Sequence, residues 1–92
     1  MIEIKNIQGK TITRIDGDYM WNMYIHDTDL SNADFRDSRI AFARIVNCNL
    51  TGADFRGADL SKARIEKCNF NDAIIDRFTK LPKRDSKDYG FC

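Results

Sequence analysis

The chain has 92 residues, of which 42% are hydrophobic, and a formal net charge of +1. This length predicts one small domain, near the size at which a single core is marginal. The balanced charge argues against a polybasic nucleic-acid binder and against a strongly acidic protein. The N-terminus lacks the apolar core of a signal peptide, and no apolar run is long enough to span a membrane, so a cytoplasmic location is expected.

Residues 1–27 are predicted to form an N-terminal cap. Apolar residues alternate over residues 2–15 around a turn at Gly9, which predicts a β-hairpin. The apolar run 19–25 then reads as an irregular first coil, in which we interpret Trp21 and Tyr24 as packing residues of the cap. His26 is the only histidine, and no serine or cysteine constellation accompanies it, so no catalytic role is assigned to it.

Residues 28–77 repeat the same residue classes every five positions. The third residue of each block is large and apolar, and the residue two positions earlier is small. The large residues are Leu30, Phe35, Ile40, Ile45, Leu50, Phe55, Leu60, Ile65, Phe70 and Ile75. A helix repeats its face at 3.6 residues and a strand at 2, so neither element alone explains a period of five. Two residues that are two positions apart in a short extended segment point the same way, and a corner then resets the phase.

The blocks ADFRD, ADFRG and ADLSK carry a family resemblance. With these blocks, the sequence resembles the pentapeptide-repeat family, and in its size it is similar to small bacterial or bacteriophage members. The resemblance implies an all-β fold, a right-handed quadrilateral parallel β-helix with a hairpin cap and a short C-terminal tail. Four blocks per coil would give about 2.5 regular coils over residues 28–77.

Adding twenty to a residue number predicts which side chains stack on successive coils. Cys48 and Cys68 then share a column in the small-residue position, and we expect both to be buried free thiols. Asp34 and Asp54 stack beside Arg36 and Arg56. Their place in the consensus favours a structural role over acid and base chemistry.

Residues 78–92 are predicted to form a capping tail, because the frame fails after Arg77 and Lys80 takes the next large position. The apolar residues of this tail are expected to cover the last coil. In the related family this segment often carries a dimer contact, which makes Phe78, Leu81, Tyr89 and Phe91 candidate residues for a homodimer.

The outward positions supply the candidate binding residues. Arg44 and Arg64 are expected to stack about 4.8 Å apart, where they repel each other unless an anion or a partner's carboxylate satisfies them. Together with Phe42, Val46 and Lys67 they form a predicted partner-binding patch. The alternative is that Phe42 packs against the cap or the tail and that the arginines are solvated.

No nucleophile motif, phosphate loop or metal-ligand set is present, so the sequence predicts a non-enzyme without cofactor or metal. The favoured function is a protein-interaction module that binds and modulates another macromolecule, such as a phage or bacterial inhibitor of a host enzyme or defence system. No direct binding to nucleic acid or membrane is expected. Two alternatives are a DNA-mimicking modulator of DNA gyrase, as in the resembling family, and a binder of a small anion such as a nucleotide at the basic face.

Overall fold

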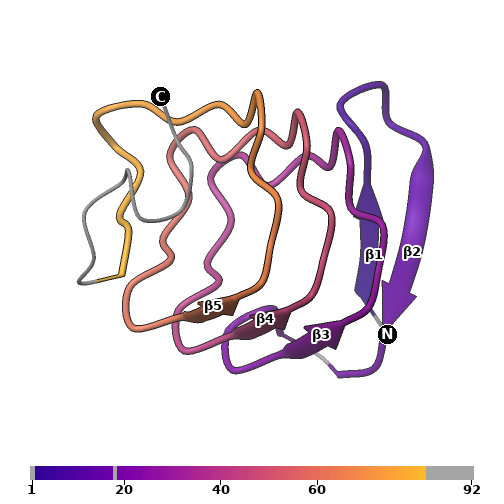
Figure 1. Cartoon of the computed structure of the whole chain (residues 1–92), viewed down its shortest axis with the longest axis horizontal. Helices are drawn as coiled ribbons and strands as arrows, with labels where there is room; N and C mark the ends of the chain where they lie inside the picture. Colours follow the sequence, from indigo (N-terminus) through magenta and orange to yellow (C-terminus); the bar gives the residue numbers. More distant parts are fainter. Residues whose placement is uncertain (1, 18, 83–92) are drawn as a thin grey trace.

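The computed structural model of the protein describes residues 2–17 and 19–82, and its regular elements are all β (Figure 1). The longest axis measures 31 Å, and the other two measure 25 and 24 Å. A hairpin stands at the end where the N-terminus lies, and the rest of the described chain winds away from it (Figure 1). Within the described residues, no helix has the length and apolar character needed to cross a membrane.

Strands β1 (Ile2–Lys5) and β2 (Thr11–Ile15) pair in antiparallel fashion, so a hairpin stands where the alternation predicted one. Asn6 organises the turn, because its Oδ1 accepts hydrogen bonds from two backbone N–H groups of the turn, each at 3.0 Å. Ile4 is fully buried in the main core. The hairpin therefore covers the first end of the solenoid, an end that otherwise exposes apolar side chains.

Beyond the hairpin, the backbone returns to the same ladder every twenty residues. Strands β3 (Tyr24–His26), β4 (Arg44–Val46) and β5 (Arg64–Glu66) form a parallel sheet in this register (Figure 1). Isolated parallel bridges repeat the spacing on three further ladders, which join Asp29 to Asn49 and Asn69, Asp34 to Asp54 and Ile74, and Arg39 to Asp59. The described chain is thus a parallel β-helix in which each coil hydrogen-bonds to the next.

The corners explain the period of five. A residue with positive φ recurs at every fifth position from Asn22 to Asp72, with φ between 52° and 73°. Most of these residues are asparagine, aspartate or glycine, which tolerate the left-handed conformation best. The second residue of a block caps the corner when it is aspartate or asparagine. Its side chain accepts a hydrogen bond from the N–H two residues later, as at Asp29, Asp34, Asn49, Asp54, Asp59 and Asn69.

The interior consists of the predicted large and small residues. Nine of the ten large positions are buried, and Ile75, the last of them, is half-buried. Phe35 and Phe55 stack with ring centres 5.1 Å apart and planes at 9°, which is the coil-on-coil stacking expected from the spacing of twenty. Cys48 is buried as predicted. Cys68 is only half-buried, so that expectation was wrong for the second cysteine.

The frame of five breaks after Arg77 as predicted, and the last described coil shows that it resumes one residue later. The bridge from Asp59 goes to Lys80, a spacing of 21, so this coil contains one extra residue. Asp76 closes the widened corner, because its Oδ1 accepts hydrogen bonds from the backbone N–H of Gly57 at 3.1 Å and of Phe78 at 3.0 Å. After the insertion Leu81 resumes an inward position and packs against the core. The frame therefore shifts by one residue and continues.

Candidate interaction surface

Charge is segregated around the β-helix although the repeats are neutral as a whole. Residues 38–47 and 58–67, here called the basic half, carry five basic and two acidic side chains. Residues 28–37, 48–57 and 68–77, the acidic half, carry three basic and six acidic side chains. Each half comprises two ladders that follow one another along the chain. A partner with acidic groups is therefore attracted to one half and repelled by the other.

The basic half contains a ladder formed by Tyr24, Arg44 and Arg64, which stand in register on β3, β4 and β5. The Arg44 guanidinium lies over the Tyr24 ring, with Cζ 4.7 Å from its centre. Tyr24 in turn stacks on His26 at 4.7 Å between ring centres. Within residues 2–17 and 19–82, neither arginine forms an ion pair. Two neighbouring cations thus face solvent with an aromatic ring at one end.

The five residues of the predicted patch all lie on or at the corners of this face. Val46 follows Arg44 on β4 and is half-buried, while Phe42 stands at the corner before β4 and Lys67 at the corner after β5. Phe42 is 55% exposed, so it is not buried against residues 2–17 and 19–82, although it lines a hollow together with the cap residue Trp21. Its φ of 63° is unusual for a bulky side chain. The Nζ of Lys62 lies 5.5 Å from the centre of its ring.

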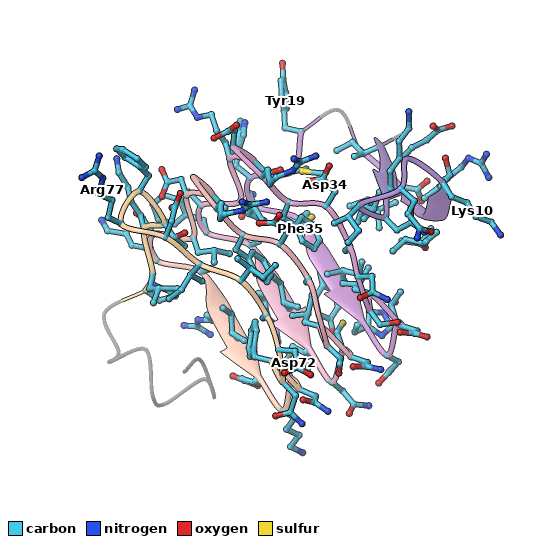
Figure 2. All side chains as sticks on the ribbon, turned by 90° about the horizontal axis from the view of Figure 1, so that it is seen from above. Lys10, Tyr19, Asp34, Phe35, Asp72 and Arg77 are labelled. Carbon is cyan, nitrogen blue, oxygen red and sulfur yellow. The ribbon has the colours of Figure 1, made fainter. Side chains whose placement is uncertain are left out.

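The prediction that Trp21 and Tyr24 pack within the cap holds in part, because each ring stacks on another cap residue, Tyr19 or His26, but neither ring is buried. Both are about half-exposed, and Tyr19 is still more exposed and projects away from the body (Figure 2). Tyr19 and Trp21 stack on each other with ring centres 5.3 Å apart. When the spacing of twenty is applied to the cap, Trp21 occupies the position equivalent to Ala41 one coil earlier, and Tyr24 the position equivalent to Arg44. That rule, had it been extended to the cap, would have added these aromatic residues to the patch.

A hollow of about 360 Å³ adjoins the ladder at the Phe42 corner. It is lined by Trp21, Arg39, Ala41, Phe42 and Asp59. It exists because a large residue in one coil is followed by a small one at the same position of the next coil, so Trp21 stands beside the short side chain of Ala41. The Asp59 carboxylate accepts the Ser61 N–H at 3.0 Å, and hydrogen bonds from the Ser61 side chain and from this N–H lower the pKa of Asp59.

The acidic half holds the predicted Asp34 and Asp54 cluster, and its contacts are structural. Arg56 reaches Asp54 Oδ2 at 2.6 Å through Nη2 and Oδ1 at 3.0 Å through Nε, and Arg36 binds Asp34 in the same manner at 2.9 Å. Among the described residues, Asp54 is the one polar or charged residue that is buried. Side-chain hydrogen bonds from these arginines lower the pKa of both aspartates, against the opposing effect of burial. Both carboxylates are therefore committed to ion pairs.

The remaining reactive side chains of the described residues are one histidine and two cysteines. His26 Nδ1 lies 3.0 Å from Asp27 Oδ2 on an exposed corner. The thiols of Cys48 and Cys68 donate hydrogen bonds to backbone carbonyls, that of Cys48 to Val46 at 3.4 Å and that of Cys68 to Glu66 at 3.3 Å. A hydrogen bond from Cys68 lowers the pKa of Cys48 to about 7, and the same contact raises that of Cys68. Among the described residues, no group of three or more histidine, cysteine, aspartate or glutamate side chains is placed to hold a metal ion.

The predicted dimer contacts fall into two groups. Phe78 is largely exposed, with the Cζ of Arg77 4.9 Å from its ring centre, whereas Leu81 packs on the core. Tyr89 and Phe91 lie outside the described residues. A second hollow of about 310 Å³ beside Phe78 is lined by Arg36, Asp37, Arg56, Gly57, Asp76 and Phe78. Its two arginines are already bound to aspartates.

Comparisons with known proteins agree with the repeat architecture. The family model for pentapeptide repeats matches residues 23–52 and 33–72, which together span more than half of the chain. No curated protein matches the chain. The crystal structure of a pentapeptide repeat protein (Rfr23) from the cyanobacterium Cyanothece 51142 is similar, with 22% identity and a TM-score of 0.38. The similarity covers 63% of this chain and 46% of that one, so this chain spans less than half the length of that protein. By the family match, the chain belongs to the pentapeptide repeat family.

Proposed function

We propose that this protein is a non-catalytic interaction module that binds another protein through its basic half. The observation that carries the proposal is the Tyr24, Arg44 and Arg64 ladder, in which two arginines in register on neighbouring strands form no ion pair with any described residue. Carboxylates of a partner would satisfy both through charge-assisted hydrogen bonds. Pentapeptide repeat proteins are often interaction modules, which agrees with this assignment.

The composition of the surface supports a protein as the partner. Arginine, tryptophan and tyrosine are the residues that most often dominate binding energy at protein interfaces. Here Trp21, Tyr24 and Phe42 are all about half-exposed and stand beside the arginines. A β-helix with a hydrogen-bonded ladder on each side holds such residues in place before the partner arrives, so little ordering entropy is lost on binding.

Three finer features belong to the same proposal. We propose a right-handed, four-sided coil with about 2.5 regular coils. The twenty-residue spacing of the ladders supports the four blocks of five residues per coil. We propose that the partner is a cytoplasmic enzyme or defence protein of a bacterial host and that binding inhibits it. The small, rigid form of the molecule supports an accessory role of this kind.

A homodimer contact at Phe78 remains part of the proposal because that ring is exposed.

The alternative functions have less support. A DNA mimic for gyrase needs a long acidic rod, but the longest axis of 31 Å corresponds to only about nine base pairs at 3.4 Å each. The acidic half also carries six acidic against three basic groups, with two of its arginines paired to aspartates. A small anion would bind best in a concave site, whereas Arg44 and Arg64 stand on neighbouring strands of one sheet, and the adjoining hollow is lined by Arg39 instead.

The test is an affinity capture from bacterial lysate, infected and uninfected, with quantitative mass spectrometry. The bait proteins are the wild type, the double variant Phe42→Ser/Arg64→Glu, and Arg77→Glu as a matched control. Arg77→Glu makes the same charge change on the acidic half, at the far end of the molecule from Lys10 (Figure 2). We expect a protein that the wild type and the control capture and the double variant does not. Equal capture by all three baits would show that the basic half is not the contact surface.

A further inference from the structure

The hollow at the Phe42 corner is separate from the arginine ladder and has its own chemistry. Two of its walls are aromatic, Trp21 and Phe42, and its floor is the methyl group of Ala41. Arg39 and Asp59 line its polar side, and a parallel backbone bridge joins these two residues across neighbouring coils. The volume of about 360 Å³ lies at the lower end of the range for pockets that enclose a small organic group.

The walls select a flat apolar group. Aromatic rings prefer offset or edge-to-face contacts with other rings, and the Trp21 and Phe42 rings offer such contacts from two directions. Tyr19 stacks on Trp21 and the Lys62 ammonium lies near the Phe42 ring, yet the two aromatic residues are still 48% and 55% exposed. An aromatic side chain that enters the hollow would remove apolar surface of both from water, which favours binding.

The surroundings of the hollow select what flanks that group. Phe42 lies two residues before Arg44, so the hollow opens beside the Arg44 and Arg64 ladder, and Arg39 stands on its other side. The basic half carries five basic and two acidic groups, and one of the two carboxylates, Asp59, already accepts the Ser61 N–H. Cations on both sides of an aromatic hollow complement an aromatic residue with carboxylates before and after it in sequence.

We propose that this hollow receives one aromatic side chain from an acidic segment of a partner protein, while Arg39 on one side and Arg44 with Arg64 on the other bind the flanking carboxylates. The inference rests on the proposed function, because it names the chemistry of the partner at the same surface. The ring of the partner residue contacts Trp21 and Phe42 over the Ala41 floor.

The test uses Trp21, the single tryptophan of the chain, as a reporter within the hollow. The probe is an end-blocked pentapeptide with one central phenylalanine between two pairs of acidic residues. The first control peptide has alanine in place of phenylalanine, and the second has lysine in place of all four acidic residues. We expect a saturable change in Trp21 emission with the probe, at least about 10-fold weaker binding of the alanine peptide, and no binding of the lysine peptide.

Two variants assign the effect to the hollow. Ala41→Leu fills the floor and should weaken probe binding at least about 10-fold while leaving the alanine peptide unchanged. Phe42→Asn removes one wall and should have the same selective effect. Its corner conformation suits asparagine, so it should remain folded. Circular dichroism and thermal unfolding check the fold of both variants.

The proposal is overturned if the phenylalanine and alanine peptides bind alike, if neither binds, or if both variants bind the probe like the wild type. An oligothymidylate titration provides the other arm. If the oligonucleotide binds more tightly than the probe, the ligand of the hollow is single-stranded nucleic acid and not a protein segment, because bases also stack on aromatic rings. If affinity capture of the partner from lysate depends on Arg64 but not on Ala41, the proposed function stands and only the proposed role of the hollow is rejected.

Discussion

The molecule contains two stacked arginine pairs with opposite surroundings. In the acidic half, Arg36 and Arg56 each stand two residues after an aspartate, which both caps the corner and binds the guanidinium. In the basic half, Arg44 and Arg64 occupy the second position of the block themselves, so the capping carboxylate and the ion-pair partner are both absent from it. Only the first pair is satisfied by the molecule's own residues.

This difference shows what the repeat consensus encodes. Aspartate or asparagine at the second position is a structural choice, because its side chain accepts the corner N–H. A block that departs from it gives up a corner hydrogen bond and presents a different side chain to solvent. Three of the four departures, Arg39, Arg44 and Arg64, fall on the basic half and carry a positive charge, whereas the fourth, Ile74, lies on the acidic half. We therefore interpret the basic departures from the consensus as the sequence mark of the interaction surface.

The largest expected effect comes from breaking the paired ladder. Asp54→Ala should lower the free energy of unfolding by about 1–2 kcal/mol, because it removes charge-assisted hydrogen bonds from a carboxylate that is only 2% exposed. The loss is limited because Arg56 is half-exposed and is solvated when freed. Urea unfolding measures it. Asp29→Ala is the matched control, since it removes a corner cap without an arginine partner, and an equal loss in both variants would contradict a role for the pair.

The stability that the paired ladder contributes through Asp54 should be lost at low pH. Hydrogen bonds from Arg56 lower the folded-state pKa of Asp54, so its stabilisation is complete above the unfolded-state pKa of about 3.9 and is lost as pH falls through the folded value. We expect wild-type stability to fall below about pH 4 and the Asp54→Ala variant to fall less steeply. Unfolding free energies at pH 7, 5, 4 and 3 test this. Parallel curves for the two proteins would exclude Asp54 as a source of the acid sensitivity.

Much of the interior could be predicted from the sequence, whereas the outside could not. The period of five specifies the inward positions because the left-handed corners reset the phase, and residues such as Leu30 and Phe55 are buried as expected. The period says nothing about where an outward side chain leans, so the hollow beside Trp21 was missed. Leu81 packs against the core as expected of the tail, but its place in the repeat could not be predicted, because a single inserted residue shifts the frame and only the backbone shows which corner absorbs it.

A smaller effect is expected at the corner beside the unpaired ladder. Phe42→Asn should stabilise the fold by about 0.5–1 kcal/mol, because a left-handed conformation costs a bulky residue more than asparagine. Thermal unfolding measures the gain. Lys67→Asn is the control, since Lys67 has the same conformation at a corner without an aromatic ring, and it should gain a similar amount. A loss of stability in Phe42→Asn alone would mean that packing of the ring outweighs its backbone strain.

The smallest expected change in stability would separate a ladder kept for a partner from one that is merely solvated. Arg64→Glu places a carboxylate beside Arg44 in the same register, so it should raise the free energy of unfolding by about 0.2–1 kcal/mol at low salt. The gain should shrink at 1 M salt, where charges are screened within about 3 Å. Arg77→Glu should show no gain. A variant that is more stable yet no longer captures the partner would show that the unpaired arginines cost the free protein stability and contribute to binding. A more stable variant that still captures it would place the contact elsewhere.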